Sequence, residues 1–110
     1  MAKKYKVIIT PQAEKQLSEI RDYILFELRS PIAAKNTLSA LKTAIESLEQ
    51  MPKRIPFADE EKWREYGIHK MSVKNFLIYF TVDENDSAVY AFAVVYARRD
   101  QKKFLEETVK

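Results

Sequence analysis

Apolar residues follow two different periods along this chain, and each period predicts a different kind of element. Between Thr10 and Met51 they recur every three or four positions, as on one face of a helix. On both sides of this region they alternate with polar residues or run continuously, as in strands that are buried on one or both faces. The pattern therefore predicts one strand, two helices and three further strands, followed by a short charged helix over residues 101–108.

The two helices begin with the same signal, a hydroxyl residue followed by proline. Thr10 and Ser30 suit the N-cap position, and Pro11 and Pro31 suit the first helical position, where the missing N–H costs nothing. We therefore expect an antiparallel helical hairpin with a connection of about two residues. Each helix carries one apolar stripe that should face the core: Ala13, Leu17, Ile20, Ile24 and Leu28 in the first, and Ala34, Leu38, Leu41, Ile45 and Leu48 in the second.

Three further apolar residues of the first helix, Tyr23, Leu25 and Phe26, lie outside its stripe. The end of this helix thus carries more apolar surface than a single buried face can use. We expect either another element or a partner protein to cover it.

The first strand is expected near residues 5–10 and the others at residues 66–73, 76–82 and 88–96. Short turns rich in Asn and Asp join the last three, so neighbouring strands should be antiparallel. Both faces of these strands are apolar, and the helical hairpin should cover one of them. In the last strand we expect Ala91 and Ala93 to share a face, where small side chains leave room for close approach.

Residues 51–65 separate the second helix from the later strands and contain two prolines and a mixture of charges. We interpret them as a loop that covers one edge of the core, with Phe57 and Trp63 as its anchors. Such a loop is also a plausible functional segment.

Composition narrows the classes of function. The 110 residues, of which 46% are apolar, suffice for one core, so we expect a single α+β domain over residues 1–110. The chain has no cysteine and one histidine, which excludes disulfides, thiolate chemistry and most His-based metal sites. No apolar run has the length of a signal peptide or a membrane span, so we expect an unprocessed cytoplasmic protein without a cofactor. The net charge of +3 does not identify a partner.

The order of the elements and three stretches of sequence together resemble the RelE/ParE superfamily of toxins from type II toxin–antitoxin modules. These stretches are IRDYILFELRSPIAAKNTLSALKTAIESLEQMP, YGIHKMSVKNFLIYFTVDE and VVYARRDQKKFL. The resemblance implies a helical hairpin packed on a small, mainly antiparallel sheet. It also implies a cognate antitoxin whose C-terminal segment wraps the toxin in a hetero-oligomer. The residues expected to contact it are Tyr23, Leu25, Phe26, Ala91 and Ala93.

The superfamily contains two activities, and the resemblance alone leaves both open. RelE-like toxins cleave mRNA on the ribosome without a metal, using basic side chains to stabilise the charged intermediate and a nearby acid/base to move protons. ParE-like toxins inhibit DNA gyrase by binding it. In a nuclease, the candidate catalytic residues would be Arg99, Arg98, Lys70, Lys74, His69 and Tyr96.

The sequence departs from the nuclease pattern at two places. Leu77 stands where the nucleases carry an arginine, and Phe104 and Leu105 stand where they carry a tyrosine. His69 and Tyr96 remain as candidate acid/base groups. A lone strand histidine, however, is more often a surface or packing residue, and a tyrosine at the end of an apolar strand is more often an aromatic residue at the edge of the core. We therefore favour a ParE-like gyrase inhibitor over the RelE-like nuclease, with a non-toxic binding module as a further alternative.

Basic residues gather after the last strand. Arg98, Arg99, Lys102 and Lys103 surround Asp100 and form a patch that could bind the target in either activity. The alternative is a salt-bridged strand end, in which Asp100 pairs with an arginine and caps the terminal helix.

Overall fold

The computed structural model describes residues 3–97. The helix expected over residues 101–108 and the basic residues Arg98, Arg99, Lys102 and Lys103 lie outside the described residues. The elements in chain order are β1 (Lys6–Ile9), α1 (Pro11–Asp22), a π-helical turn (Tyr23–Glu27), α2 (Pro31–Glu46), 3₁₀ turns at Ser47–Glu49 and Pro52–Arg54, α3 (Glu61–Glu65), β2 (His69–Val73), β3 (Phe76–Asp83) and β4 (Ala88–Tyr96).

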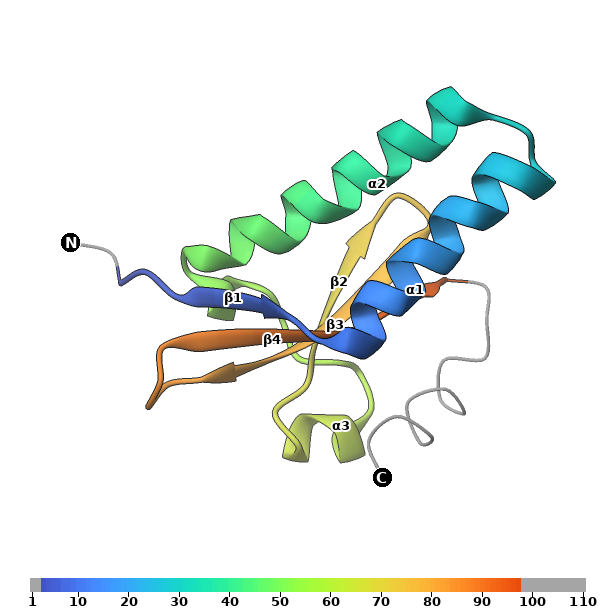
Figure 1. Ribbon diagram of the computed structural model, residues 1–110. Helices are drawn as coiled ribbons and strands as arrows, with labels where there is room; N and C mark the ends of the chain where they lie inside the picture. Colours follow the sequence, from blue (N-terminus) through green and yellow to red (C-terminus); the bar gives the residue numbers. More distant parts are fainter. Residues whose placement is uncertain (1–2, 98–110) are drawn as a thin grey trace.

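The four strands form one sheet in the order β1-β4-β3-β2. β2, β3 and β4 pair in antiparallel fashion, whereas β1 runs parallel to β4. The hairpin of α1 and α2 lies over one face of the sheet, and α3 lies on the other side (Figure 1). This arrangement confirms the predicted α+β fold with a helical hairpin on a mainly antiparallel sheet.

Both predicted helix starts are confirmed. The side chain of Thr10 accepts a hydrogen bond from the N–H of Ala13, and that of Ser30 accepts one from the N–H of Ala33, each at 3.3 Å. These bonds satisfy backbone donors that the first turn of a helix cannot pair internally. The local sequence therefore set where both helices begin.

The end of the first helix differs from the prediction. At Tyr23 the α-helix widens into a π-helical turn, in which the N–H of Leu28 donates to the carbonyl of Tyr23 at 3.2 Å. The wider turn holds one residue more than an α-turn, so the positions after it are rotated about the helix axis. Leu28, which the apolar spacing places in the core stripe, is consequently 58% exposed.

The core has two parts because both faces of β3 are buried. Alternate residues of this strand face opposite sides, as the sequence predicted. The helix-side core contains Ala13, Leu17, Leu41, Ile45, Leu48, Met71, Ile78, Phe80, Val89, Ala91 and Val94. The outer core contains Ala58, Trp63, Ile68, Leu77, Tyr79, Ala93 and Val95.

A β-bulge in β4 corrects the predicted faces of that strand. Tyr79 pairs with Ala93 but Phe80 pairs with Ala91, so Phe92 is an extra residue with no partner of its own. The side chains after Phe92 are therefore shifted to the opposite face. Ala91 belongs to the helix-side core and Ala93 to the outer core, so the prediction that they share a face is wrong.

The segment between α2 and β2 covers an edge of the sheet, as the sequence led us to expect, because Phe57 forms a bridge with His69 of the edge strand β2. It also covers part of the outer face of the sheet. Trp63 lies in the short helix α3 and is buried in the outer core, which confirms it as an anchor. Phe57 is 47% exposed and stacks instead on His69. Gly67, with φ of +73°, ends α3 and shortens the predicted strand of residues 66–73.

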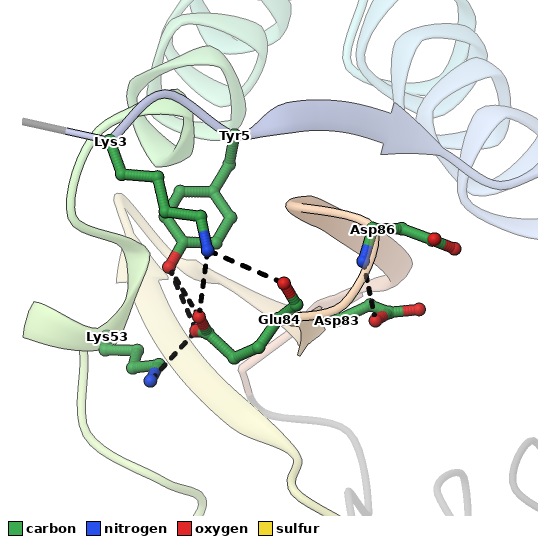
Figure 2. A network of polar contacts seen from close by, with 6 residues as sticks. All are labelled: Lys3, Tyr5, Lys53, Asp83, Glu84 and Asp86. Atoms are coloured by element: carbon green, nitrogen blue, oxygen red, sulfur yellow. Dashed lines mark hydrogen bonds and ion pairs between the residues drawn. The ribbon is translucent and has the colours of Figure 1, made fainter.

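Polar contacts join the residues just before β1 to the turn between β3 and β4 (Figure 2). The carboxylate of Glu84 accepts hydrogen bonds from the hydroxyl of Tyr5 at 2.9 Å and from Lys3 at 3.3 Å. Lys53, from the first 3₁₀ turn after Met51, forms an ion pair with it at 2.8 Å. The hydrogen bonds from Lys53 and Tyr5 lower the pKa of Glu84 to about 2.

Candidate functional site

A groove of about 710 Å³ lies between the helical hairpin and one end of the sheet. Its helical wall comes from the second half of α1, the π-helical turn and the start of α2, and its other wall comes from β4 and the turn before β3. The lining residues are Gln16, Glu19, Ile20, Tyr23, Ile24, Leu28, Ala33, Thr37, Asn75, Phe76, Val94, Val95 and Tyr96.

Aromatic and aliphatic side chains dominate the rim of this groove. Tyr23 is 58% exposed and Tyr96 is 40% exposed, although both are large and partly apolar. The rings of Tyr96 and Phe76 contact each other across two strands, with centroids 5.5 Å apart. Leu28 reaches the rim because the π-helical turn removes it from the core stripe. The groove is thus an exposed apolar surface of the kind that binds another protein.

The structure places the predicted antitoxin-contact residues in different environments. Tyr23 lines the groove, whereas Leu25 is half-buried and Phe26, which is exposed, is outside the lining. Ala91 and Ala93 are fully buried and offer no surface to a partner in this structure. Of the predicted set, Tyr23 therefore has the clearest position for such a contact.

Of the residues that line the groove, sequence reasoning named only Tyr23 and Tyr96 as candidate site residues, and two of the others, Leu28 and Gln16, show why. Leu28 was assigned to the core, because a π-helical turn has no signal that we could recognise in the sequence. Gln16 lies on α1, where its side-chain oxygen accepts a hydrogen bond from the backbone N–H of Val94 at 2.8 Å. A polar residue on a helix gave no indication of this contact with a distant strand.

His69, one of the candidate catalytic residues, is buried in the structure. Its imidazole stacks between the rings of Phe57 and Phe80, with centroid distances of 4.4 and 4.9 Å. Its Nδ1 lies 2.9 Å from the carbonyl oxygen of Ile55, so this nitrogen carries the proton in the neutral ring and donates it. This arrangement is that of a packing residue, one of the two non-catalytic roles considered from the sequence, the other being a surface residue.

The next candidate, Lys70, points to the opposite face of the sheet from His69, because successive residues of a strand alternate. Its Nζ lies 2.9 Å from Oδ2 of Asp59, and this hydrogen bond lowers the pKa of the Asp59 carboxyl. Tyr79 pairs with Lys70 across the strands, and burial raises the pKa of its phenol to about 12, with a contribution from the charge of Asp59. At neutral pH this phenol is protonated and is not available as a base.

Lys74 and Tyr96 lie at the same end of the sheet. Lys74 is exposed in the turn between β2 and β3 with φ of 55°, and Tyr96 pairs with Phe76 directly after this turn. Leu77, in the position where the nucleases carry arginine, is buried in the outer core. The described members of the candidate catalytic set are therefore distributed over both faces and one end of the sheet.

Residues 3–97 contain neither a candidate metal site nor a helix that could span a membrane. No group of three or more His, Cys, Asp or Glu side chains in this part of the chain is placed to hold a metal ion. The helices described there are all too short or too polar to cross a membrane.

Comparison with known proteins decides the family. A profile described as the ParE toxin of the type II toxin–antitoxin system parDE matches residues 7–101. The chain belongs to the ParE toxin family. The match extends from β1 to beyond β4 and so includes every element that lines the groove. The predicted membership of the RelE/ParE superfamily is confirmed.

Solved structures similar to this ParE-family chain share its fold at low sequence identity. A chain of the chromosomal ParDE system from P. aeruginosa has a TM-score of 0.72 at 15% identity, covering 88% of this chain and 100% of that one. An E. coli RelE mutant in the free state has a TM-score of 0.64 at 13% identity, and the match covers 99% of this chain and 96% of that one. A chain of the RelBE2 toxin–antitoxin complex from Mycobacterium tuberculosis has a TM-score of 0.59 at 16% identity, and the match covers 84% of this chain and 91% of that one. No curated protein matches the chain by sequence.

Proposed function

We propose that this ParE-family toxin inhibits DNA gyrase and that a cognate antitoxin neutralises it by occupying the groove. The observation that carries the choice of gyrase is the position of the candidate nuclease residues. His69 is enclosed by two rings, Lys70 is paired with Asp59 on the other face, and Leu77 is buried where a cation would be needed.

Metal-independent cleavage of a phosphodiester requires the catalytic side chains to lie together on one surface. Cations must lie close to the phosphate to stabilise the negative charge of the intermediate, and a proton-transfer group must lie within hydrogen-bond reach of the reacting oxygens. The three residues above do not converge on such a point. Inhibition by binding requires only a complementary surface, so it is compatible with the arrangement observed.

One observation favours the RelE-like ribonuclease as the second candidate. Lys74 and Tyr96 lie at the same end of the sheet, and the backbone N–H of Ala97 donates to the carbonyl of Asn75 there. Arg98 and Arg99 follow Ala97 in the sequence. A phosphate bound at this end would have the ammonium group of Lys74 and the phenol of Tyr96 nearby. Together with Arg98 and Arg99, these two residues would then form the catalytic set. A non-toxic binding module remains the third candidate.

The antitoxin as a partner is supported by the groove and by the family. Tyr23, Leu28 and Tyr96 expose apolar surface around a hollow lined mainly by apolar side chains. Toxins of type II systems are controlled by a protein antitoxin, and the similar solved structures include toxin–antitoxin complexes. An antitoxin that fills the groove would bury these side chains, which gives it a source of affinity.

A direct assay distinguishes the candidate functions. Purified chain is added to gyrase with relaxed plasmid DNA and, in parallel, to ribosomes programmed with mRNA. We expect loss of supercoiling with accumulation of cleaved DNA–gyrase complexes, and intact mRNA. Antitoxin added in equimolar amount should restore supercoiling and serves as the control for specific action.

The opposite result would replace the proposal. Codon-phased cuts in the mRNA with normal supercoiling would identify a ribonuclease, and Lys74→Ala should then reduce the rate of cleavage. If a saturating amount of the chain neither inhibits supercoiling nor cleaves the mRNA, the result would support a non-toxic binding module.

A further inference from the structure

One side of β4 lacks a neighbouring strand over its second half. β1 pairs with β4 from Lys6 opposite Ala88 to Ile9 opposite Ala91, where the N–H of Thr10 donates to the carbonyl of Ala91. There the chain turns into α1 and leaves the sheet. Within the part of the chain that the structure describes, no strand pairs with residues 92–96 on this side.

The direction of the backbone groups along this edge follows from the pairing with β3. The N–H of Ala97 donates to the carbonyl of Asn75, so the polar groups of Ala97 point toward β3. Those of Tyr96 and Val94 must then point away from β3, because successive residues alternate. The contact of Val94 agrees, since its N–H donates to the side-chain oxygen of Gln16 on α1 at 2.8 Å. A side-chain amide thus stands where the carbonyl of another strand would stand.

The groove runs along this edge. Val94, Val95 and Tyr96 form one wall, and α1, the π-helical turn and α2 form the other. Its volume of about 710 Å³ lies within the range of sites that hold a bound ligand. Among the described lining residues Glu19 is the only charged side chain, so an occupant with a basic residue opposite Glu19 would be complementary.

We propose that an extended segment of the antitoxin enters the groove and pairs as a β-strand with residues 94–96 of β4, replacing the Gln16 side chain at Val94. The inference rests on the proposed antitoxin and specifies how it binds. Alternate side chains of the segment would contact Tyr23 and Leu28 on the helical wall, and a basic residue would face Glu19. A helix in the same place would cover the edge without pairing Tyr96, because a helix satisfies its own backbone groups.

Two variants at one position isolate the backbone hydrogen bond. Tyr96→Pro and Tyr96→Ala both remove the ring, but only proline also removes the N–H. Proline is tolerated here because this N–H points away from β3. Circular dichroism checks that both variants fold. With the full-length cognate antitoxin as the probe, we expect Tyr96→Pro to bind about tenfold more weakly than Tyr96→Ala in calorimetry.

Substitution of Gln16 tests the same arrangement, but here the affinity for the antitoxin is not expected to fall. In the strand arrangement Gln16 competes with the antitoxin for the N–H of Val94, so Gln16→Ala should leave the affinity unchanged or raise it up to about fivefold. A fall in affinity of tenfold or more would instead mean that the occupant uses the Gln16 side chain, and would overturn the strand arrangement. Hydrogen exchange should show that the Tyr96 amide of the full chain is unprotected when free and protected in the complex.

The outcomes separate this inference from the function on which it rests. If the unmodified chain does not bind the antitoxin, the proposed partner itself fails. If it binds but Tyr96→Pro equals Tyr96→Ala, the strand arrangement is overturned, and weaker binding by Tyr23→Asp would then indicate a helix in the groove. Protection of the Tyr96 amide in the free chain would show that the chain itself covers this edge, which also overturns the inference.

Discussion

His69 lies between the rings of Phe57 and Phe80, and this position determines what its imidazole does. The same residue, exposed beside a phosphate, would be the natural proton-transfer group near neutral pH. In this structure one ring nitrogen is bonded to the carbonyl of Ile55 and both ring faces are covered. Its contribution is therefore to hold the segment before α3 against the edge strand β2.

Replacing His69 should reduce the stability of the fold, because the imidazole packs and bonds within it. His69→Ala removes two ring stacks and a hydrogen bond and leaves a cavity, so we expect the free energy of unfolding to fall by about 3 kcal/mol. For His69→Asn, whose side-chain amide can still donate to the Ile55 carbonyl, the fall should be smaller. Urea denaturation at neutral pH measures both. Full stability of His69→Ala would contradict the packing role and return His69 to the candidate catalytic groups.

At the scale of elements, Trp63 is the large side chain that attaches α3 to the outer face of the sheet. Trp63 packs in the outer core against residues of β3 and β4, although α3 has only one turn and a half of helix around it. Its indole Nε1 is buried and has no hydrogen-bond partner. The anchor thus combines a large gain from apolar burial with the cost of an unpaired donor.

This combination predicts an unequal response to two substitutions. Trp63→Ala should lower the free energy of unfolding by about 4 kcal/mol, because it opens a cavity beneath α3. Trp63→Phe should cost only about 1 kcal/mol, because the smaller ring also removes the unpaired N–H. Thermal and urea denaturation test the pair, and equal losses for both would show that the indole N–H finds a partner in solution.

The π-helical turn is the other element that shapes the molecule. In a continuous α-helix Leu28 would follow Ile24 into the core, as the apolar spacing indicates. The extra residue of the turn keeps Ile24 buried and places Leu28 at the rim of the groove beside Tyr23. An irregular turn of this kind is common at functional sites, and here it builds one wall of the proposed antitoxin site.

At the scale of the whole molecule, Glu84 joins three segments that are far apart in the sequence (Figure 2). Tyr5 precedes β1, Lys53 follows α2 and Glu84 begins the turn after β3. The contacts hold the parallel strand β1 in place at the end of the sheet opposite the groove. Each is exposed, so solvent and salt weaken them, yet together they depress the pKa of one carboxyl.

The lowered pKa of Glu84 predicts how stability depends on pH. The value is about 2 in the folded chain against 4.5 for a free glutamate, so the folded state favours the ionised form. This stabilisation is complete above about pH 4.5 and is lost as the pH falls toward 2. Glu84→Gln should therefore be less stable than the unmodified chain at pH 7, and the difference should vanish near pH 2. Urea denaturation at pH 7, 4.5 and 3 measures it, with Asp86→Asn on the same turn as the matched control.

The helix starts and the faces of β3 could be predicted from the sequence, whereas two irregularities of the backbone could not. Thr10 and Ser30 fixed the helix starts, because an N-cap acts within one turn and needs no distant partner. The alternation along β3 likewise identified the faces of that strand. By contrast, the bulge at Phe92 and the widened turn at Tyr23 shift a periodic pattern by one residue, and nothing in the local sequence marked either position.

What the sequence determined by itself is the two long helices, the four strands and their order, because helix caps, hydrophobic periods and turns depend on residues close together in the chain. The superfamily followed from the resemblance of whole stretches of the sequence. The tertiary structure decided the site. The groove, the contact of Gln16 with Val94, the burial of His69 and the separation of Lys70 from it arise from residues up to 78 positions apart. Such contacts depend on how elements pack and in which register they pair, and a period of two or of 3.6 residues does not encode that register across distant elements.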